Sequence, residues 1–536
     1  MKRLFAILFA FLFVCSAVKV LPKAHAEEVL ELNIMNWEDY IDAGDEEEGT
    51  KSVIDEFVDY YKETYGKTVV VEYSTWGTSE NMYTELKSNP NHYDLLCPSE
   101  YMILKMLAED MLEPLQRTQK LNVNVYDQGV SPYISNLFKN LKVTGANGEE
   151  RILYDYASCY MWGTMGFVYN PEYVSEEDVK HWSVVWNDDY FNKATIKDSV
   201  RDSYILAIGY VYAEQLLDLK NEIDGKKENY LNGEITKAQY EDEVKEYNGK
   251  ITDIFNNVSG DSLTLTGEAL KTLNDKLYGY EVDSGKKDMA AGKIWINFAW
   301  SGDAVYAIDF AEDPEEVGDN LAELYYCVPE EGSNIFFDGW VMPKGADVAL
   351  AQEFINFVQR PDIALRNMNY IGYTTSVATD EIFEYLVGED GYAYSQDDVK
   401  EIDGKFFVEV ENENGQMEDV EVFPVDLSYL FARDENALYV AYTEVLGRQF
   451  STQYPDYETV SRCTVMRNFN DEELKNLNEM WADAKEGNAG TQGLYIAILI
   501  TVILLVVGAL IIFIDKHGLL QRHGIKGYKV IKKEEL

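Results

Sequence analysis

Short apolar runs alternate with amphipathic stretches along the chain from Val29 onward. The amphipathic stretches place apolar side chains at helical spacing, and Gly66 is positioned to end the first of them. The expected strands cover 30–37, 67–76 and 93–99, and the expected helices cover 52–66 and 80–89. This alternation predicts an α/β fold with a parallel sheet, because successive parallel strands need a crossover connection.

A second α/β segment is expected from residue 154, and two insertions interrupt the later part of the chain. Residues 213–255 are highly charged with helical periodicity, which predicts a helical hairpin that turns near Asn232. Residues 406–424 alternate apolar and polar side chains on both sides of Asn414 and Gly415, as a β-hairpin does.

Acidic, aromatic and small polar residues gather just after the expected strands. Parallel sheets bind ligands beyond the carboxyl ends of their strands, so these positions are candidates for a binding site. Carboxylates form charge-assisted hydrogen bonds with ammonium groups, and aromatic rings attract a cation or line an alkyl stem. The alternative is an aromatic core with solvated acids beside it. The candidate ligand-binding residues are Trp37, Glu38, Tyr40, Ser99, Tyr101, Asp202, Trp300, Asp303, Asp338 and Tyr373.

Apolar runs at both ends predict an exported chain that is held at a membrane. Residues 1–26 combine a basic start, an apolar run and an A-x-A site ending at Ala26, which predicts a secretory signal peptide. Residues 494–514 carry no charge and are long enough to cross a bilayer as one transmembrane helix. The basic residues of 515–536 predict a cytoplasmic tail. The rest is therefore expected on the extracytoplasmic face of the cell membrane, joined to the span by a polar tether at 485–493.

The net charge and the absence of catalytic motifs limit the partners and activities that the protein could have. Lys and Arg total 46 and Asp and Glu total 95, so the formal net charge is −49. Such a surface repels phosphate backbones and attracts cations, which excludes nucleic acid as a partner. The sequence contains no nucleotide-binding, nucleophile-elbow or zinc-protease motif, and we expect no catalytic residue, cofactor or metal. The pairing of Cys97, Cys159, Cys327 and Cys463 is left open, because spacing alone does not decide it.

Several segments together resemble the spermidine/putrescine-binding proteins of ABC transporters. They are NIMNWEDYID at 33–42, YDLLCPSEY at 93–101, AWSGDA at 299–304, IFFDGWVMPKGA at 335–346 and the run FINFVQRPDIALRNMNYIGYTT at 354–375. The resemblance implies a two-lobed periplasmic-binding-protein-like fold of type II, in which the chain crosses a hinge more than once. It places 27–153 and 301–378 in the first lobe, and 154–300 and 379–484, with both insertions, in the second.

The same resemblance implies roles for the candidate residues. Trp37, Tyr40 and Tyr373 match wall aromatics, while Ser99 and Tyr101 match a polar and aromatic pair after the third strand. Trp300 matches a family tryptophan. The acids Asp202, Asp303 and Asp338 match groups that contact ligand amines. Glu38 stands where the family often has Ser or Thr, and Ser199 where spermidine-type members tend to have an acid.

The function implied is that of a substrate receptor for a polyamine importer. The receptor would capture putrescine or spermidine outside the cell and deliver it to a permease and an ATPase that are separate chains. One alternative is a receptor of the same fold for another solute, such as an amino acid, a thiamine-like cation or a metal chelate. Another is a surface enzyme or adhesin whose insertions are its working parts.

Overall fold

The computed structural model describes residues 29–45, 49–118, 123–387, 391–411, 415–431, 439–442 and 446–486. The expected signal peptide, the apolar run 494–514 and the tail 515–536 lie outside these residues. Among the helices of the described residues, none is long and apolar enough to span a bilayer.

The first lobe is built on the parallel strands predicted from the sequence. Strand β1 (Val29–Trp37) pairs in parallel with β2 (Thr68–Trp76), in register from Val29 opposite Thr68 to Trp37 opposite Trp76, and also with β3 (Leu95–Leu96). The crossover helices are α2 (Val53–Tyr65) and α3 (Ser79–Ser88). The Ser52 hydroxyl caps the start of α2, and Gly66 ends it with a φ of 68°, a conformation that suits glycine.

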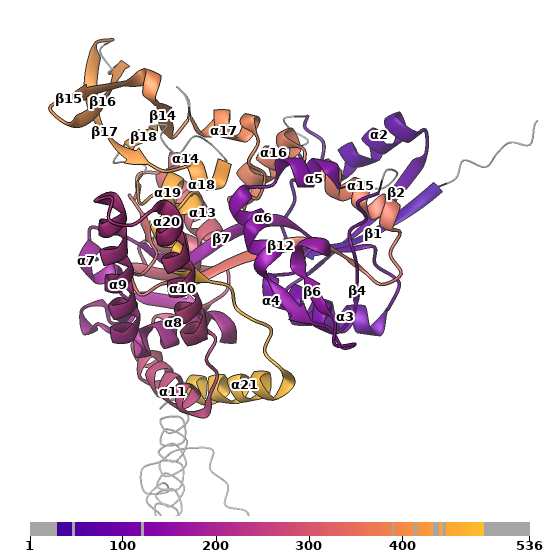
Figure 1. Ribbon diagram of the computed structural model, residues 1–536, viewed down its shortest axis with the longest axis horizontal. Coiled ribbons are helices and arrows are strands. Elements are labelled where there is room, and N and C mark those ends of the chain that lie inside the picture. The colour runs from indigo at the N-terminus through magenta and orange to yellow at the C-terminus, as the bar shows by residue number, and fades with distance from the viewer. Residues whose placement is uncertain are drawn as a thin grey trace, which may run out of the picture.

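Two long strands run between the lobes, β7 (Ala157–Tyr169) and β12 (Ser333–Pro343). They pair with each other in antiparallel fashion, and every residue in both is buried. The first part of β7 lies beside β12 and β13 (Thr374–Thr375), whereas its last residues pair with β10 (Ile296–Trp300) and β11 (Tyr325–Cys327). One continuous strand therefore belongs to both lobes, and Figure 1 shows β7 and β12 between them.

The second lobe continues the sheet in the order β7, β10, β8 (Ala194–Lys197), β9 (Gly279–Glu281). Strand β8 is parallel to both β9 and β10, so its carboxyl end points the same way as theirs. The helices α8 (Val200–Val211) and α13 (Ser301–Glu312) begin just after β8 and β10, which brings both helix starts to one edge of the sheet.

The structure corrects the predicted lobe boundaries. Residues 301–327 were expected in the first lobe, but α13 packs on β7, β10 and β11, and β11 pairs with the end of β7 in the second-lobe part of the sheet. Conversely, α17 (Asp380–Leu386) and α18 (Ser428–Phe431), expected in the second lobe, pack on α16 (Pro361–Ile371) and α6 (Pro132–Asn140). The chain crosses between the lobes inside β7 and again inside β12, where every residue is buried and the burial pattern shows no boundary.

Both predicted insertions have the expected local structure. Helices α9 (Ala213–Leu231) and α10 (Lys237–Phe255) form a hairpin that turns at Gly233, whose φ is 75°. Strands β16 (Lys405–Glu411) and β17 (Met417–Val425) pair in antiparallel fashion. They belong to a five-stranded sheet with β14 (Ala393–Ser395), β15 (Val399–Ile402) and β18 (Tyr439–Tyr442), which projects at the upper left of Figure 1.

The remaining elements surround the central sheet, to which β4 (Leu112–Glu113) and β19 (Cys463–Thr464) add short strands beside β12. Those after the first-lobe strands are α4 (Glu100–Ala108), β4 (Leu112–Glu113), α5 (Asn124–Gly129), β5 (Lys142–Thr144), β6 (Glu150–Ile152) and α15 (Val348–Val358). Those around the second lobe are α7 (Glu176–Val179), α11 (Gly260–Asn274), α12 (Gly285–Ala290), α14 (Pro314–Val317), α19 (Gln449–Gln453), α20 (Tyr457–Ser461), β19 (Cys463–Thr464) and α21 (Asp471–Glu486). The short 3₁₀ turns are η1 (Leu153–Asp155), η2 (Trp182–Trp186), η3 (Asp188–Tyr190) and η4 (Gln396–Asp398). Cys97, Cys159, Cys327 and Cys463 are free thiols.

Candidate functional site

Asp338 occupies the middle of β12, at a point where the strand's register with β7 shifts. The carboxylate is 6% exposed and accepts two hydrogen bonds, from the Tyr40 hydroxyl to Oδ2 and from the Ser99 hydroxyl to Oδ1, each at 2.7 Å. Among the described residues no Lys or Arg forms an ion pair with it. Burial raises the pKa of Asp338 to about 6, and the hydroxyl donors offset only part of that rise.

Aromatic rings surround this carboxylate. The Tyr40 ring contacts Tyr373 and Tyr160 edge to face, with ring centroids 5.6 and 5.7 Å apart. Tyr373 in turn lies 5.9 Å from Phe336, and Trp37 lies 5.6 Å from Trp76 at the paired ends of β1 and β2. Such rings exclude water and present faces that favour an alkylammonium group.

Asp303, in the first turn of α13, is a second buried carboxylate with a different environment. Its Oδ2 lies 3.0 Å from the Lys197 ammonium, and its Oδ1 lies 3.5 Å from the Lys286 ammonium. Oδ1 also accepts a 3.2 Å hydrogen bond from the Tyr373 hydroxyl, which links this carboxylate to the aromatic wall. Burial acts to raise the pKa of Asp303, but the two lysines act more strongly, and the pKa lies below its ordinary value.

Lys197, the last residue of β8, is the centre of this charged cluster. Its ammonium binds Asp303 and Glu281 at 3.0 Å each and donates to the Val282 carbonyl at 2.9 Å. It also lies 4.3 Å from the centre of the Trp300 ring. The side chain is 2% exposed, so its ammonium interacts with these protein groups rather than with solvent.

A third group lies where α8 begins, opposite α4. The Arg201 guanidinium stacks on the Tyr101 ring at 3.8 Å, and the Tyr101 hydroxyl donates to Glu80 at 3.2 Å. Burial raises the pKa of Asp202 to about 6. Burial, together with the charge of nearby Asp338, raises the pKa of Glu100 to about 8, so this side chain is mostly protonated at neutral pH.

The structure places nine of the ten predicted residues in these three groups. Glu38 is the exception: it is exposed in the turn after β1, because the chain turns there and directs Tyr40 inward instead. The ten candidate residues include neither Lys197, Lys286 and Arg201 nor Glu100, although Glu100 lies at the same strand end as Ser99 and Tyr101. Lys197 ends a strand and could have been found by the same strand-end rule, whereas Lys286 lies on the short helix α12 and gives no such signal.

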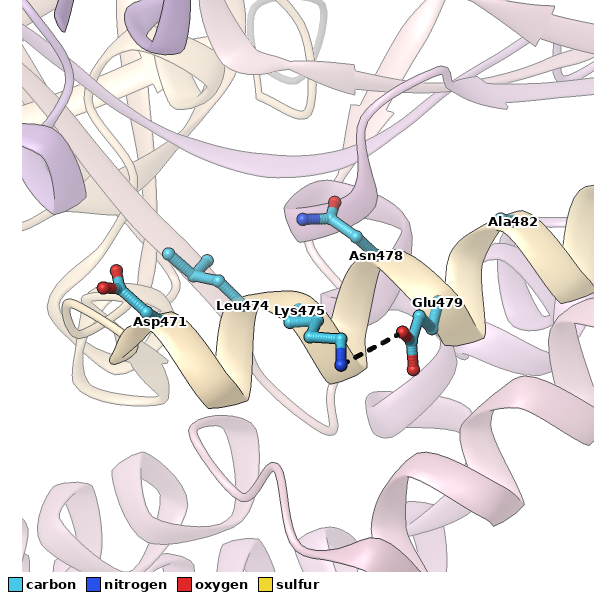
Figure 2. A pocket seen from close by; sticks show the side chains of 6 residues that line it. All are labelled: Asp471, Leu474, Lys475, Asn478, Glu479 and Ala482. Carbon is cyan, nitrogen blue, oxygen red and sulfur yellow. Dashed lines mark ion pairs between the residues drawn. The ribbon is translucent and has the colours of Figure 1, made fainter.

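The described residues contain no group of three His, Cys, Asp or Glu side chains suited to a metal ion. Figure 2 shows a surface hollow lined by Asp471, Leu474, Lys475, Asn478, Glu479 and Ala482, all on α21. Its Lys475–Glu479 pair is 3.6 Å long and mostly exposed, a kind of pair that contributes little binding energy. The hollow contains none of the candidate residues and is separate from the candidate site.

Two lobes joined by shared strands, with acids and aromatic rings at the junction, define the class of solute-binding proteins. The structure resembles that of the spermidine/putrescine ABC transporter substrate-binding protein PotD from Streptococcus pneumoniae, with a TM-score of 0.51 and 23% identity, over 85% of this chain and 98% of that one.

The chain belongs to the family of bacterial extracellular solute-binding proteins, whose model matches residues 56–382. The spermidine/putrescine-binding periplasmic protein of Salmonella typhimurium is 24% identical over 374 residues, which cover 69% of this chain and 85% of that protein. The putrescine-binding periplasmic protein PotF of Escherichia coli is 23% identical over 358 residues, covering 66% and 79%.

Proposed function

We propose that this protein is the extracytoplasmic receptor of a polyamine importer, binding a ligand such as putrescine or spermidine at the junction of its lobes. The observation that carries the proposal is Asp338, a buried carboxylate held by two hydroxyl donors and facing aromatic rings, with no cation paired to it among the described residues. A buried carboxylate without a countercharge is costly, so a ligand cation that pairs with it gains free energy.

The surrounding residues suit an amine that carries a carbon chain. Tyr40 and Tyr373 offer ring faces for methylene groups, and the Tyr373 hydroxyl connects the Asp338 region to Asp303. An alkyl diamine carries a positive charge at each end, which corresponds to two acids linked by an aromatic wall. The names of the relatives from Salmonella typhimurium and Escherichia coli support the same ligand class.

The receptor would act with other chains. The sequence has no ATP-binding motif, so the permease and the ATPase would be separate subunits. The uncharged run 494–514 followed by a basic tail would anchor the receptor to the outer face of the cell membrane, and anchoring raises its effective concentration near the permease. The lobes would open and close about β7 and β12 to admit and release the ligand.

Calorimetric titration of the full-length protein with putrescine, spermidine and spermine tests this proposal. An amino acid and thiamine, added in separate titrations, represent the other ligand classes that such a fold takes. We expect saturable one-to-one binding of at least one polyamine and no heat from the neutral amino acid. Tight binding of the amino acid or of thiamine, with no polyamine bound at millimolar concentration, would contradict the proposal.

A further inference from the structure

Asp303, the second acid of the proposed amine site, is already neutralised by the protein's own ammonium groups. Lys197 and Lys286 reach different oxygens of this carboxylate, at 3.0 and 3.5 Å. Asp338 has no such partner among the described residues. A diamine that pairs one ammonium with Asp338 would therefore meet an occupied carboxylate at its other end.

The two lysines differ in how readily they could give way. The Lys197 side chain is 2% exposed and has three oxygen partners, so removing it from Asp303 would break a buried cluster. The Lys286 side chain is 19% exposed, and its contact with Asp303 is the longer one. Its ammonium also lies 2.6 Å from Asp283, whose side chain is 80% exposed. Lys286 thus already pairs with a carboxylate that is exposed to solvent.

We propose that Lys286 is a displaceable internal substitute for a ligand ammonium, and that it sets the selectivity of the site between monoamines and diamines. This inference rests on the proposed function. When a diamine binds, its second ammonium takes the place of Lys286 at Asp303, and Lys286 keeps its pair with Asp283. A monoamine that pairs only with Asp338 leaves Lys286 where it is, so only the diamine bears the cost of the exchange.

The ring of Tyr306 is consistent with such a movement. The Lys286 ammonium lies 4.9 Å from the centre of this ring, which is itself 38% exposed at the surface of α13. An ammonium over a partly exposed ring keeps a favourable interaction while its carboxylate partner changes. Lys286 therefore lies between a buried acid, an exposed acid and an aromatic ring, all within reach of its ammonium.

The test compares Lys286→Gln with Lys287→Gln, a substitution of the exposed neighbour on the same helix that removes the same charge. Binding of 1,4-diaminobutane and of butylamine is measured by calorimetry for each full-length protein. We expect Lys286→Gln to bind the diamine about tenfold more tightly, because an ion pair of this partly buried kind no longer competes. Its butylamine affinity and both affinities of Lys287→Gln should change less than about twofold. Lys286→Arg, which keeps the charge, should behave like the unmodified protein.

Two results would overturn the inference, and a third, different result would overturn the proposed function. If the unmodified protein binds the diamine and Lys286→Gln binds it no more tightly than Lys287→Gln does, the receptor function stands and the role of Lys286 is wrong. If Lys286→Gln tightens both amines equally, its charge acts at long range rather than by exchange, which also contradicts the inference. If no variant binds either amine at millimolar concentration, the polyamine function itself fails.

Discussion

Replacing Asp338 with Asn is expected to weaken ligand binding and, at the same time, to stabilise the ligand-free protein. Burial raises the pKa of this carboxyl from 3.8 to about 6, and no Lys or Arg of the described residues pairs with it. Since each pKa unit corresponds to about 1.4 kcal/mol, the charged form costs the folded state about 3 kcal/mol at pH 7. Asn keeps the shape without the charge, so the free energy of unfolding should rise by about 1–3 kcal/mol.

The size of this effect depends on pH. A carboxyl whose pKa is raised on folding destabilises the folded state only where the unfolded chain is ionised. The stability difference between the two proteins should therefore be absent below about pH 4, grow between about pH 4 and 6, and be constant above that range. Urea unfolding at several pH values, without ligand, measures it.

Binding should change in the opposite direction. Removing one partner of a buried charged pair costs about 2–5 kcal/mol, which corresponds to a loss of affinity between about thirtyfold and a few thousandfold. Glu38→Gln removes an equal charge from the exposed turn near the site and should leave putrescine affinity within about twofold of the unmodified value. Unchanged binding by Asp338→Asn, or a lower urea midpoint at pH 7, would refute the reasoning.

Three further results are expected. Putrescine affinity should fall about tenfold from pH 7 to pH 5, because the pKa of Asp338 is raised to about 6 and only the ionised form pairs with an ammonium; calorimetry at each pH checks this. Gly302→Ala should reduce affinity at least about tenfold in the same assay, since its Cβ would lie 1.9 Å from the Tyr373 ring and displace it. Lys197→Met should lower the free energy of unfolding by about 3–5 kcal/mol in urea, because it leaves Asp303 buried beside a second acid without their shared cation.

Each of these predictions has a matched control. The pH dependence should flatten in Asp338→Asn, and an equally steep fall there would assign it to another group. Gly225 lies in open space on α9, so Gly225→Ala should bind normally; normal binding by Gly302→Ala as well would show that the Tyr373 ring is not required. Lys193 is partly exposed, and Lys193→Met should lower the free energy of unfolding by less than about 1 kcal/mol. An equally small decrease for Lys197→Met would show that the buried pairs of Lys197 do not stabilise the fold.

The local elements could be predicted because they depend on short-range patterns. The alternation from β1 to β3, the end of α2 at Gly66 and the hairpin of α9 and α10 all follow from side-chain periodicity and turn residues. The positions where the chain crosses between lobes could not be predicted. All residues of β7 and β12 are buried along their whole lengths, so the change of neighbouring strands leaves no mark in their sequence.

The candidate site could likewise be predicted only in part from the sequence. Acids and aromatic residues at strand ends could be found, since the edge where parallel strands end is known to bind ligands. The pairing of Asp303 with its countercharges could not, because Lys197 and Lys286 precede it by 106 and 17 residues, and Lys286 does not lie at a strand end. Only the folded chain shows that Asp303 pairs with two lysines, whereas Asp338 pairs with no cation of the part of the chain that the structure describes.

A crystal structure of the protein with putrescine would show whether a ligand ammonium pairs with Asp338 between the lobes. We expect one amine nitrogen within hydrogen-bond distance of the Asp338 carboxylate, a carbon chain against Tyr40 and Tyr373, and the second nitrogen at Asp303. Putrescine bound elsewhere on the molecule, with no amine nitrogen within hydrogen-bond distance of Asp338, would contradict this expectation.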